Sequence, residues 1–249
     1  MTGAIAYDSH DLALLAGIEE RHFWFRARRR IIVEALARCF PSARNYLEVG
    51  CGTGYMLRGI AEAFPSWKIV SSDALAFSAG NASGAGAMHL QFDIRHIPFQ
   101  GEFDVLGAYD VLEHIEDDCA ALDEMRRACR PGGGILLTVP QHPWLWSNAD
   151  DYAHHYRRYT SGLLRARVER TGFETVWLSS FNTLNLPLLL LRSGALRAAG
   201  RNPQAKVPAA PANWLLEKSM DMDGMLIRAG WQLPVGGSLV LAARRRESR

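Results

Sequence analysis

The sequence predicts an α/β fold: a doubly wound, mostly parallel sheet of seven strands, with helices before the first strand and an insertion near the C-terminus. Three observations predict it. Short apolar runs of strand length alternate along the chain with segments that have helical spacing. A turn containing Gly50, Gly52 and Gly54 follows the first of these runs and leads into a helix. The 249 residues are 48% hydrophobic and 22% charged, which is typical of a globular chain with a sizeable core.

Two helices are expected before the first strand, over residues 11–20 and 23–40. In the second, apolar residues recur at the spacing of one buried helix face, and Pro41 ends it. Aromatic and basic side chains crowd the junction of the two helices, over residues 21–26. Packing of a helix at the edge of the domain would explain this segment without any functional role.

The apolar runs predict strands over residues 46–49, 67–71, 88–92, 103–109, 135–139, 173–179 and 238–243. The segments between them predict helices over residues 53–64, 117–130 and 161–170, and a weak helix followed by a loop within residues 74–87. This alternation of strands and helices is what a doubly wound sheet requires.

Two later segments differ from this pattern. Residues 140–160 are rich in aromatic side chains and histidines, whose polar tips would all need partners in a core, so we interpret them as a substrate loop. Residues 181–223 form an insertion that combines leucines and arginines with a linker rich in proline and alanine. The insertion is either a hydrophobic element packed on the domain or an interfacial element that contacts lipid or a dimer partner.

Charge and cysteine usage narrow the partners and the compartment. A net charge of +2 gives no indication of nucleic acid as a partner. The four cysteines have neither a Cys-x-x-Cys pair nor zinc-site spacing, as expected for free thiols in the cytoplasm. The N-terminus lacks a secretory pattern, and the apolar stretch 184–191 is too short to span a bilayer. Peripheral membrane contact through residues 181–197 stays open.

The glycine spacing distinguishes between classes of cofactor. The dinucleotide fingerprint G-x-G-x-x-G would require glycine at position 55, which is Tyr55. Glu48 precedes the first glycine by two residues, and its carboxylate would repel a pyrophosphate. A cationic ligand is more compatible with this carboxylate, and a nicotinamide dehydrogenase is therefore the least favoured enzyme class.

The pattern Glu48-x-Gly50-x-Gly52-x-Gly54 resembles the first motif of class I S-adenosylmethionine-dependent methyltransferases. Residues 110–117 resemble the segment after the fourth strand in the ubiquinone-type, or type 11, branch, and residues 130–133 resemble its Arg-Pro-Gly-Gly turn. The resemblance covers residues 45–139. It implies a Rossmann-like methyltransferase fold with S-adenosylmethionine as cofactor, a methyltransferase domain over residues 45–249 and a helical lid over residues 1–44.

The resemblance also implies cofactor ligands. Glu48, Gly50, Gly52 and Gly54 belong to the loop, and Asp110 lies where the methyl group and the acceptor should meet. Asp73 would bind the ribose hydroxyls, a role consistent with an acid that ends the second strand. Asp93 would accept a hydrogen bond from the adenine amine, and the backbone amide of Ile94 would meet a ring nitrogen.

The candidate catalytic residues are those that could take a proton from a hydroxyl acceptor. They are His114, His142, His155 and Tyr159, with His154 beside them, and we rank His114 and His142 first. A divalent cation held by Asp110, Glu113 and His114 is an alternative. Relatives with a similar metal-binding arrangement have Glu at the first of these positions, so Asp110 departs from their pattern.

The predicted function is transfer of a methyl group from S-adenosylmethionine to a small-molecule acceptor or a lipid- or glycan-linked one, at oxygen. Two alternatives stay open. A nucleic-acid or protein methyltransferase is disfavoured by the near-neutral charge and by the absence of the Asn/Asp-Pro-Pro-Tyr/Phe signature. A non-catalytic protein that binds S-adenosylmethionine would show cofactor binding without turnover.

Overall fold

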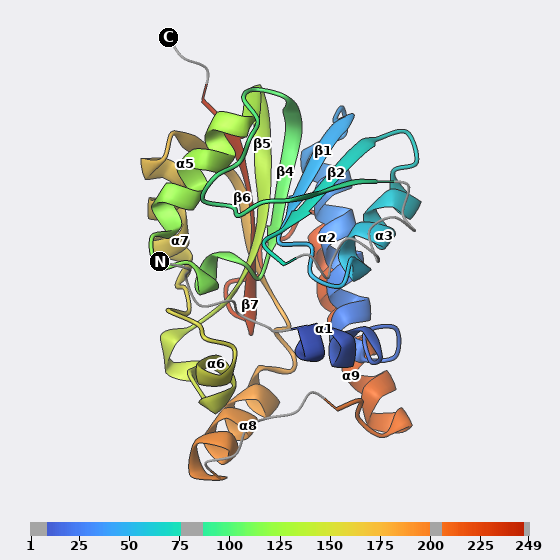
Figure 1. The fold of residues 1–249 in the computed structure, drawn as a ribbon. Helices are drawn as coiled ribbons and strands as arrows, with labels where there is room; N and C mark the ends of the chain where they lie inside the picture. Colours follow the sequence, from blue (N-terminus) through green and yellow to red (C-terminus); the bar gives the residue numbers. More distant parts are fainter. Residues whose placement is uncertain (1–8, 76–86, 200–205, 247–249) are drawn as a thin grey trace.

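A single seven-stranded sheet runs through the computed structural model, which describes residues 9–75, 87–199 and 206–246 (Figure 1). Its strands are β1 (Asn45–Val49), β2 (Lys68–Asp73), β3 (Met88–Gln91), β4 (Phe103–Tyr109), β5 (Cys129–Pro140), β6 (Phe173–Phe181) and β7 (Ser238–Arg245). Their order across the sheet is β3-β2-β1-β4-β5-β7-β6. The first five strands are parallel, and β7 pairs antiparallel with both β5 and β6. The predicted fold class is confirmed.

Helices cover both faces of this sheet (Figure 1). The helices are α1 (Ser9–Ala16), α2 (Phe23–Cys39), α3 (Tyr55–Ala63), α5 (Asp118–Ala128), α6 (Asn148–Tyr152), α7 (Ser161–Arg170), α8 (Leu186–Ala199) and α9 (Ala210–Arg228). Single 3-10 turns lie at η3 (Leu112–His114) and η4 (Pro143–Leu145). Helices α5 and α7 pack on one face, whereas α2, α3 and α9 pack on the other.

Side chains alternate between the two faces along the central strands. In β1, Tyr46 joins the core beneath α2 and α9, while its neighbour Leu47 joins the core beneath α5 and α7. Both side chains are fully buried. Burial on both faces is typical of parallel strands. The carboxyl ends of parallel strands lie at the same end of the sheet, and in doubly wound folds ligands bind there.

The N-terminal helix α2 is attached to the insertion helix α9 by charged pairs. Arg30 contacts Glu217 at 2.7 Å and Asp221 at 2.6 Å, and Arg26 contacts Glu217 at 3.2 Å. The two helices are remote in sequence, so these contacts fix the insertion against the segment that precedes the sheet.

Several predicted boundaries are wrong. The helix predicted to begin at residue 53 begins at Tyr55, because Gly54 adopts a left-handed conformation that cannot continue a helix. Strand β5 begins at Cys129 rather than 135, because Cys129 and Gly134 pair with Phe103 and Val105 across a register shift. The insertion forms two helices, and α9 extends beyond residue 223. Most of the weak helix predicted within 74–87 lies outside the described residues.

Among the described residues, no helix has both the length and the apolar character needed to cross a bilayer.

Replacing Ile32 with alanine should destabilise the protein, because this side chain of α2 is completely buried against the sheet. We expect the free energy of unfolding to fall by about 2–5 kcal/mol, as for other buried Ile-to-Ala substitutions. Urea denaturation would measure the change. Leu14→Ala is the control, since Leu14 is 54% exposed, and it should cost less than about 0.5 kcal/mol. Equal costs for both variants would contradict the packing of α2.

Candidate functional site

The glycine turn after β1 has the backbone that its sequence predicts. Gly50, Gly52 and Gly54 have φ angles of 71°, 52° and 74°, in the left-handed region that favours glycine. At Gly50, a Cβ atom would also lie 2.6 Å from a methyl group of Val111. The turn therefore presents bare backbone at the carboxyl end of β1.

Asp73 ends β2 beside this turn. Its carboxylate accepts hydrogen bonds from the backbone N–H of Gly52 at 2.8 Å and from the N–H of Leu75 at 2.9 Å. These bonds hold the glycine turn and leave acceptor capacity for a further donor. The geometry is compatible with the predicted ribose ligand, and that role stays a prediction.

A buried arginine lies among carboxyl groups at the ends of β1 and β4. Arg28 of α2 contacts Asp110 at 3.0 Å, and Asp110 also accepts a hydrogen bond from Thr138 at 2.9 Å. Burial raises the pKa of Glu48 to about 8, although the charge of Arg28 acts in the opposite direction. One oxygen of Glu48 is buried without a hydrogen-bond partner. Sequence analysis did not single out Arg28, because only the fold brings it beside these carboxyl groups.

The first helix covers the glycine turn from outside. Glu19 is buried, and both of its carboxylate oxygens accept hydrogen bonds from the Thr53 hydroxyl, at 2.8 and 2.7 Å. Leu12 of α1 is also buried, and a Cβ atom added at Gly52 would lie 3.9 Å from one of its methyl groups. These contacts place residues of the predicted lid against the loop, while opening and closing of that lid stays a prediction.

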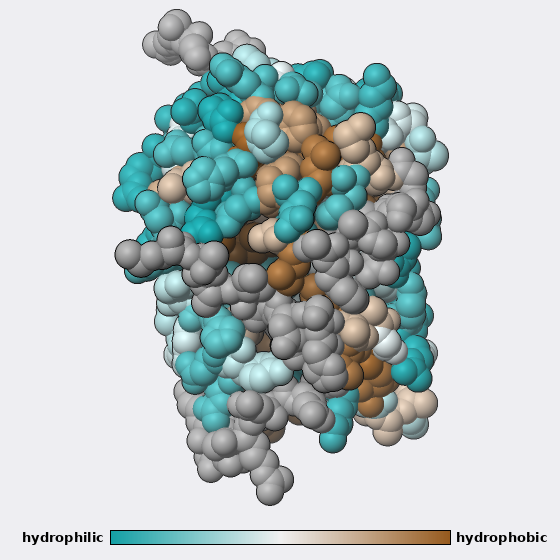
Figure 2. Space-filling model, viewed as in Figure 1, coloured by the Kyte–Doolittle hydropathy of each residue, from teal (hydrophilic) through white to brown (hydrophobic). Residues whose placement is uncertain are grey.

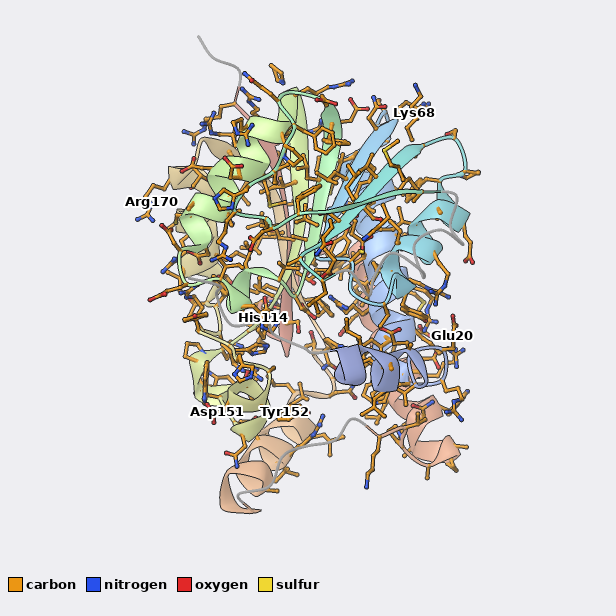
Figure 3. The ribbon with its side chains drawn as sticks, in the orientation of Figure 1. Glu20, Lys68, His114, Asp151, Tyr152 and Arg170 are labelled. Carbon is orange, nitrogen blue, oxygen red and sulfur yellow. The ribbon has the colours of Figure 1, made fainter. Side chains whose placement is uncertain are left out.

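Two of the predicted histidines meet at the carboxyl end of the sheet. The rings of His114 and His155 are 4.7 Å apart in an edge-to-face arrangement. Figure 3 shows His114 below the strand ends and above α6, the helix of Asp151 and Tyr152. Burial and the neighbouring His155 lower the pKa of His114 to about 4, so this ring is neutral at pH 7.

His155 is oriented by a buried carboxylate. Its Nδ1 lies 2.9 Å from Asp150, which also pairs with Arg158 at 2.7 Å. Burial alone would raise the pKa of Asp150, but the hydrogen bonds from His155 and Arg158 lower it to about 2. Asp150 is therefore ionised at neutral pH. A base held by a third group is a recurrent catalytic arrangement, and it ranks His155 above His114 and His142.

Among the described residues, Glu113, His114 and His155 form a group that could hold a cation, with ligand atoms all within 4.8 Å of one another. The predicted ligand Asp110 is instead paired with Arg28. Burial, followed by the nearby Asp110, raises the pKa of Glu113 well above its usual range. A protonated carboxyl group is a poor metal ligand, so a cation would first have to displace this proton.

A cavity of about 750 Å³ connects these groups. Its lining includes Gly50, Gly52 and Glu48 of the predicted cofactor loop. It also includes Asp110, the group of Glu113, His114 and His155, and residues of α8 and α9. The cavity thus joins the predicted cofactor loop to the histidine pair.

Other predicted residues do not line this cavity. Tyr159 is fully buried and donates a hydrogen bond to Asp118 at 2.7 Å, a geometry that supports a structural role rather than a catalytic one. The ring of His142 stacks on Trp144. Asp93 pairs with Arg95 at 2.5 Å, and Ile94 is buried in the core. The roles predicted for Asp93 and Ile94 stay predictions.

Residues 21–178 of the chain match a family model described as a methyltransferase domain. A Mycolicibacterium smegmatis protein named "Probable S-adenosylmethionine-dependent methyltransferase" is 29% identical over an alignment of 169 residues, which covers 64% of this chain and 63% of that protein. The trans-aconitate 2-methyltransferase of Azoarcus sp. is 28% identical over 57% of this chain and 54% of its own. The chain thus spans less than two thirds of these relatives' length.

Solved structures share the fold. One is a chain from the complex of the Haloferax volcanii Trm112 methyltransferase activator with a methyltransferase, with a TM-score of 0.63 and 17% identity over 98% of this chain and 99% of that one. Another is phosphoethanolamine N-methyltransferase 2 of Haemonchus contortus in complex with S-adenosyl-L-methionine, with a TM-score of 0.59 and 18% identity over 87% and 52% of the two chains. The predicted Rossmann-like methyltransferase fold is confirmed.

Binding of S-adenosylmethionine at pH 7 should release a proton from Glu48. The carboxyl group is mostly protonated in the free protein because its pKa is about 8, and a nearby sulfonium or ammonium group favours the ionised form. Affinity should therefore rise with pH between 6 and 8, by up to about tenfold per unit. Calorimetric titration in buffers of different ionisation enthalpy measures the number of protons released on binding. Glu48→Gln should abolish this release, and an unchanged proton count in this variant would contradict the assignment.

Proposed function

Because the chain belongs to the methyltransferase domain family, we propose that it transfers the methyl group of S-adenosylmethionine to a hydroxyl group on a small-molecule acceptor or one linked to a lipid or glycan. The observation that carries the proposal is the continuous cavity from the glycine turn, past the histidine pair, to the leucines of α8. It provides adjoining space for a cofactor and for an acceptor with an apolar part.

The cofactor supplies the leaving group, so the protein must bind the cofactor and the acceptor, align their reacting atoms and exclude water. The bare backbone of Gly50 and Gly52 gives close approach, and Glu48 and Asp110 are carboxyl groups for the cationic methionine moiety. Arg28 beside them is a cation that the carboxylate of the same moiety could meet. In transfer, the carbon–sulfur bond breaks as the carbon–oxygen bond forms, and S-adenosylhomocysteine leaves.

The proton of the acceptor hydroxyl goes to His155 in this proposal. The contact with Asp150 favours a proton on Nδ1, so Nε2 is left as the acceptor atom. Asp150 also stabilises the imidazolium that forms when Nε2 takes the proton. His114, with its low pKa, is a neutral neighbour that does not compete for the proton at pH 7.

The part of the cavity lining that the insertion contributes favours an acceptor with both apolar and anionic parts. Leu188, Leu189 and Leu216 belong to it, together with Arg192 and Lys206. A lipid- or glycan-linked alcohol that carries a phosphate would match this lining. A protein or nucleic-acid acceptor is the rival class, and a non-catalytic protein would bind the cofactor without any turnover.

Replacing His155 with asparagine should reduce methyl transfer by about 10²–10⁴-fold, the usual contribution of a positioned base. The readout is incorporation of radiolabel from S-adenosylmethionine into a panel of hydroxyl-bearing amphiphiles and glycolipids. Cofactor affinity, measured by calorimetry, should stay unchanged. His154→Asn is the matched control, because His154 is exposed and its φ of 54° suits asparagine.

If His155→Asn and His154→Asn transfer methyl groups equally well, His155 is not the base. If the folded protein binds neither S-adenosylmethionine nor S-adenosylhomocysteine, the proposed function itself is wrong.

Dialysis against a chelator should leave methyl transfer unchanged, because Asp110 is engaged by Arg28 and burial favours the protonated form of Glu113. Activity with and without added magnesium measures this. Loss of activity on chelation, restored by magnesium, would instead assign Glu113, His114 and His155 to a divalent cation.

A further inference from the structure

Exposed apolar side chains gather around α8 and the start of α9, on what we call the α8/α9 face. It consists of Leu184, Leu188, Leu190 and Leu191 at α8 and Trp214 and Leu215 at the start of α9. The most exposed are Leu191 at 73%, Leu215 at 63% and Trp214 at 61%. Figure 1 shows α8 and α9 at the same end of the molecule, beyond the carboxyl ends of the parallel strands.

Contacts between the two helices make this one surface. The side chain of Asn185, just before α8, accepts a hydrogen bond from Ser219 of α9 at 2.8 Å and donates one to the backbone oxygen of Leu216 at 3.4 Å. Leu188 and Leu216 both line the cavity. Figure 2 shows apolar surface in the region of α9. The exposed leucines and Trp214 are therefore continuous with the cavity's apolar lining.

The charged side chains of the segment that forms the α8/α9 face are all basic. Residues 184–216 contain four basic residues and no Asp or Glu. Arg192 and Lys206 line the cavity at this end, and the charge of Arg192 helps lower the pKa of His22, after burial. The acids that follow, Glu217 and Asp221, are already paired with arginines of α2.

We propose that the α8/α9 face docks on an anionic lipid surface, so that a lipid-linked acceptor passes its head group directly into the cavity. Leucine and tryptophan beside arginine and lysine is the composition of interfacial membrane-binding elements. A two-fold contact between two copies would instead place the same cations opposite each other. The acceptor part of this inference rests on the proposed function, whereas lipid binding is measurable without it.

The test is sedimentation of the purified protein with vesicles of phosphatidylcholine, with and without phosphatidylglycerol, at low and high salt. We expect binding to the anionic vesicles that weakens as salt rises, because each basic residue near such a surface strengthens binding about fivefold. The double variant Leu191→Glu/Trp214→Glu should reduce binding at least tenfold. Arg192→Glu should also weaken it and reduce its dependence on salt.

Met88→Glu is the matched control, because Met88 is 62% exposed but lies on the edge strand β3. It should bind vesicles like the unmodified protein. Calorimetry with S-adenosylmethionine on the same samples separates the two proposals, since Leu191 and Trp214 do not line the cavity. A protein that binds the cofactor but no vesicles overturns the docking proposal alone. Vesicle binding without cofactor binding supports docking and overturns the proposed function.

Two further outcomes would overturn the docking proposal. One is equal loss of vesicle binding in Met88→Glu and in the double variant. The other is that the unmodified protein is a dimer that does not bind vesicles, whereas the double variant is a monomer. The face would then be a contact between copies. Analytical ultracentrifugation of each variant provides this readout.

Discussion

The site depends on one buried cation among carboxyl groups. Arg28 reaches from α2 to Asp110 at the end of β4, and its charge acts on both Glu48 and Glu113. Without it, Glu48 and Asp110 would lose their nearest opposite charge, and burial together with like charges disfavours ionised carboxyl groups. Burial keeps Glu48 and Glu113 largely protonated even with Arg28 present, so the single charge of Arg28 is not enough to keep these two carboxyl groups ionised in the free protein. A cationic cofactor would add positive charge here.

The same helix, α2, connects these charged groups to the insertion helices. Arg28 points toward the sheet, whereas Arg26 and Arg30 pair with Glu217 and Asp221 of α9. Helix α9 in turn contacts the start of α8 through Asn185. The N-terminal helices and the insertion therefore act as neighbours although they lie at opposite ends of the chain. The charged contacts of α2 with α9 and the hydrogen bond between Ser219 and Asn185 thus link α2 to the α8/α9 face.

Local signals were sufficient for the fold and for the glycine turn. The turn at Gly50 and Gly52 depends on a few consecutive residues, and the strands are short apolar runs. Both could therefore be predicted from the sequence. Arg28 and the Asp150–His155 pair could not, because their roles depend on which side chains the tertiary structure brings together. Tyr159 shows the converse. It stands in an aromatic, histidine-rich segment that suggested catalysis, yet the fold buries it against Asp118.

The position of His155 follows from a helix cap. Asp150 closes the capping box of the short helix α6, accepting a hydrogen bond from the Ser147 backbone N–H at 2.9 Å, and the same carboxylate holds His155 and Arg158. One buried carboxylate thus caps the N-terminus of a helix and orients the candidate base. The two roles use different oxygens of Asp150, because Oδ2 accepts from Ser147 and Oδ1 contacts His155. Replacing Asp150 would therefore remove the helix cap and take a buried counter-ion from Arg158. The orientation of His155 is therefore fixed before any ligand binds, as the proposed role of this histidine as the base requires.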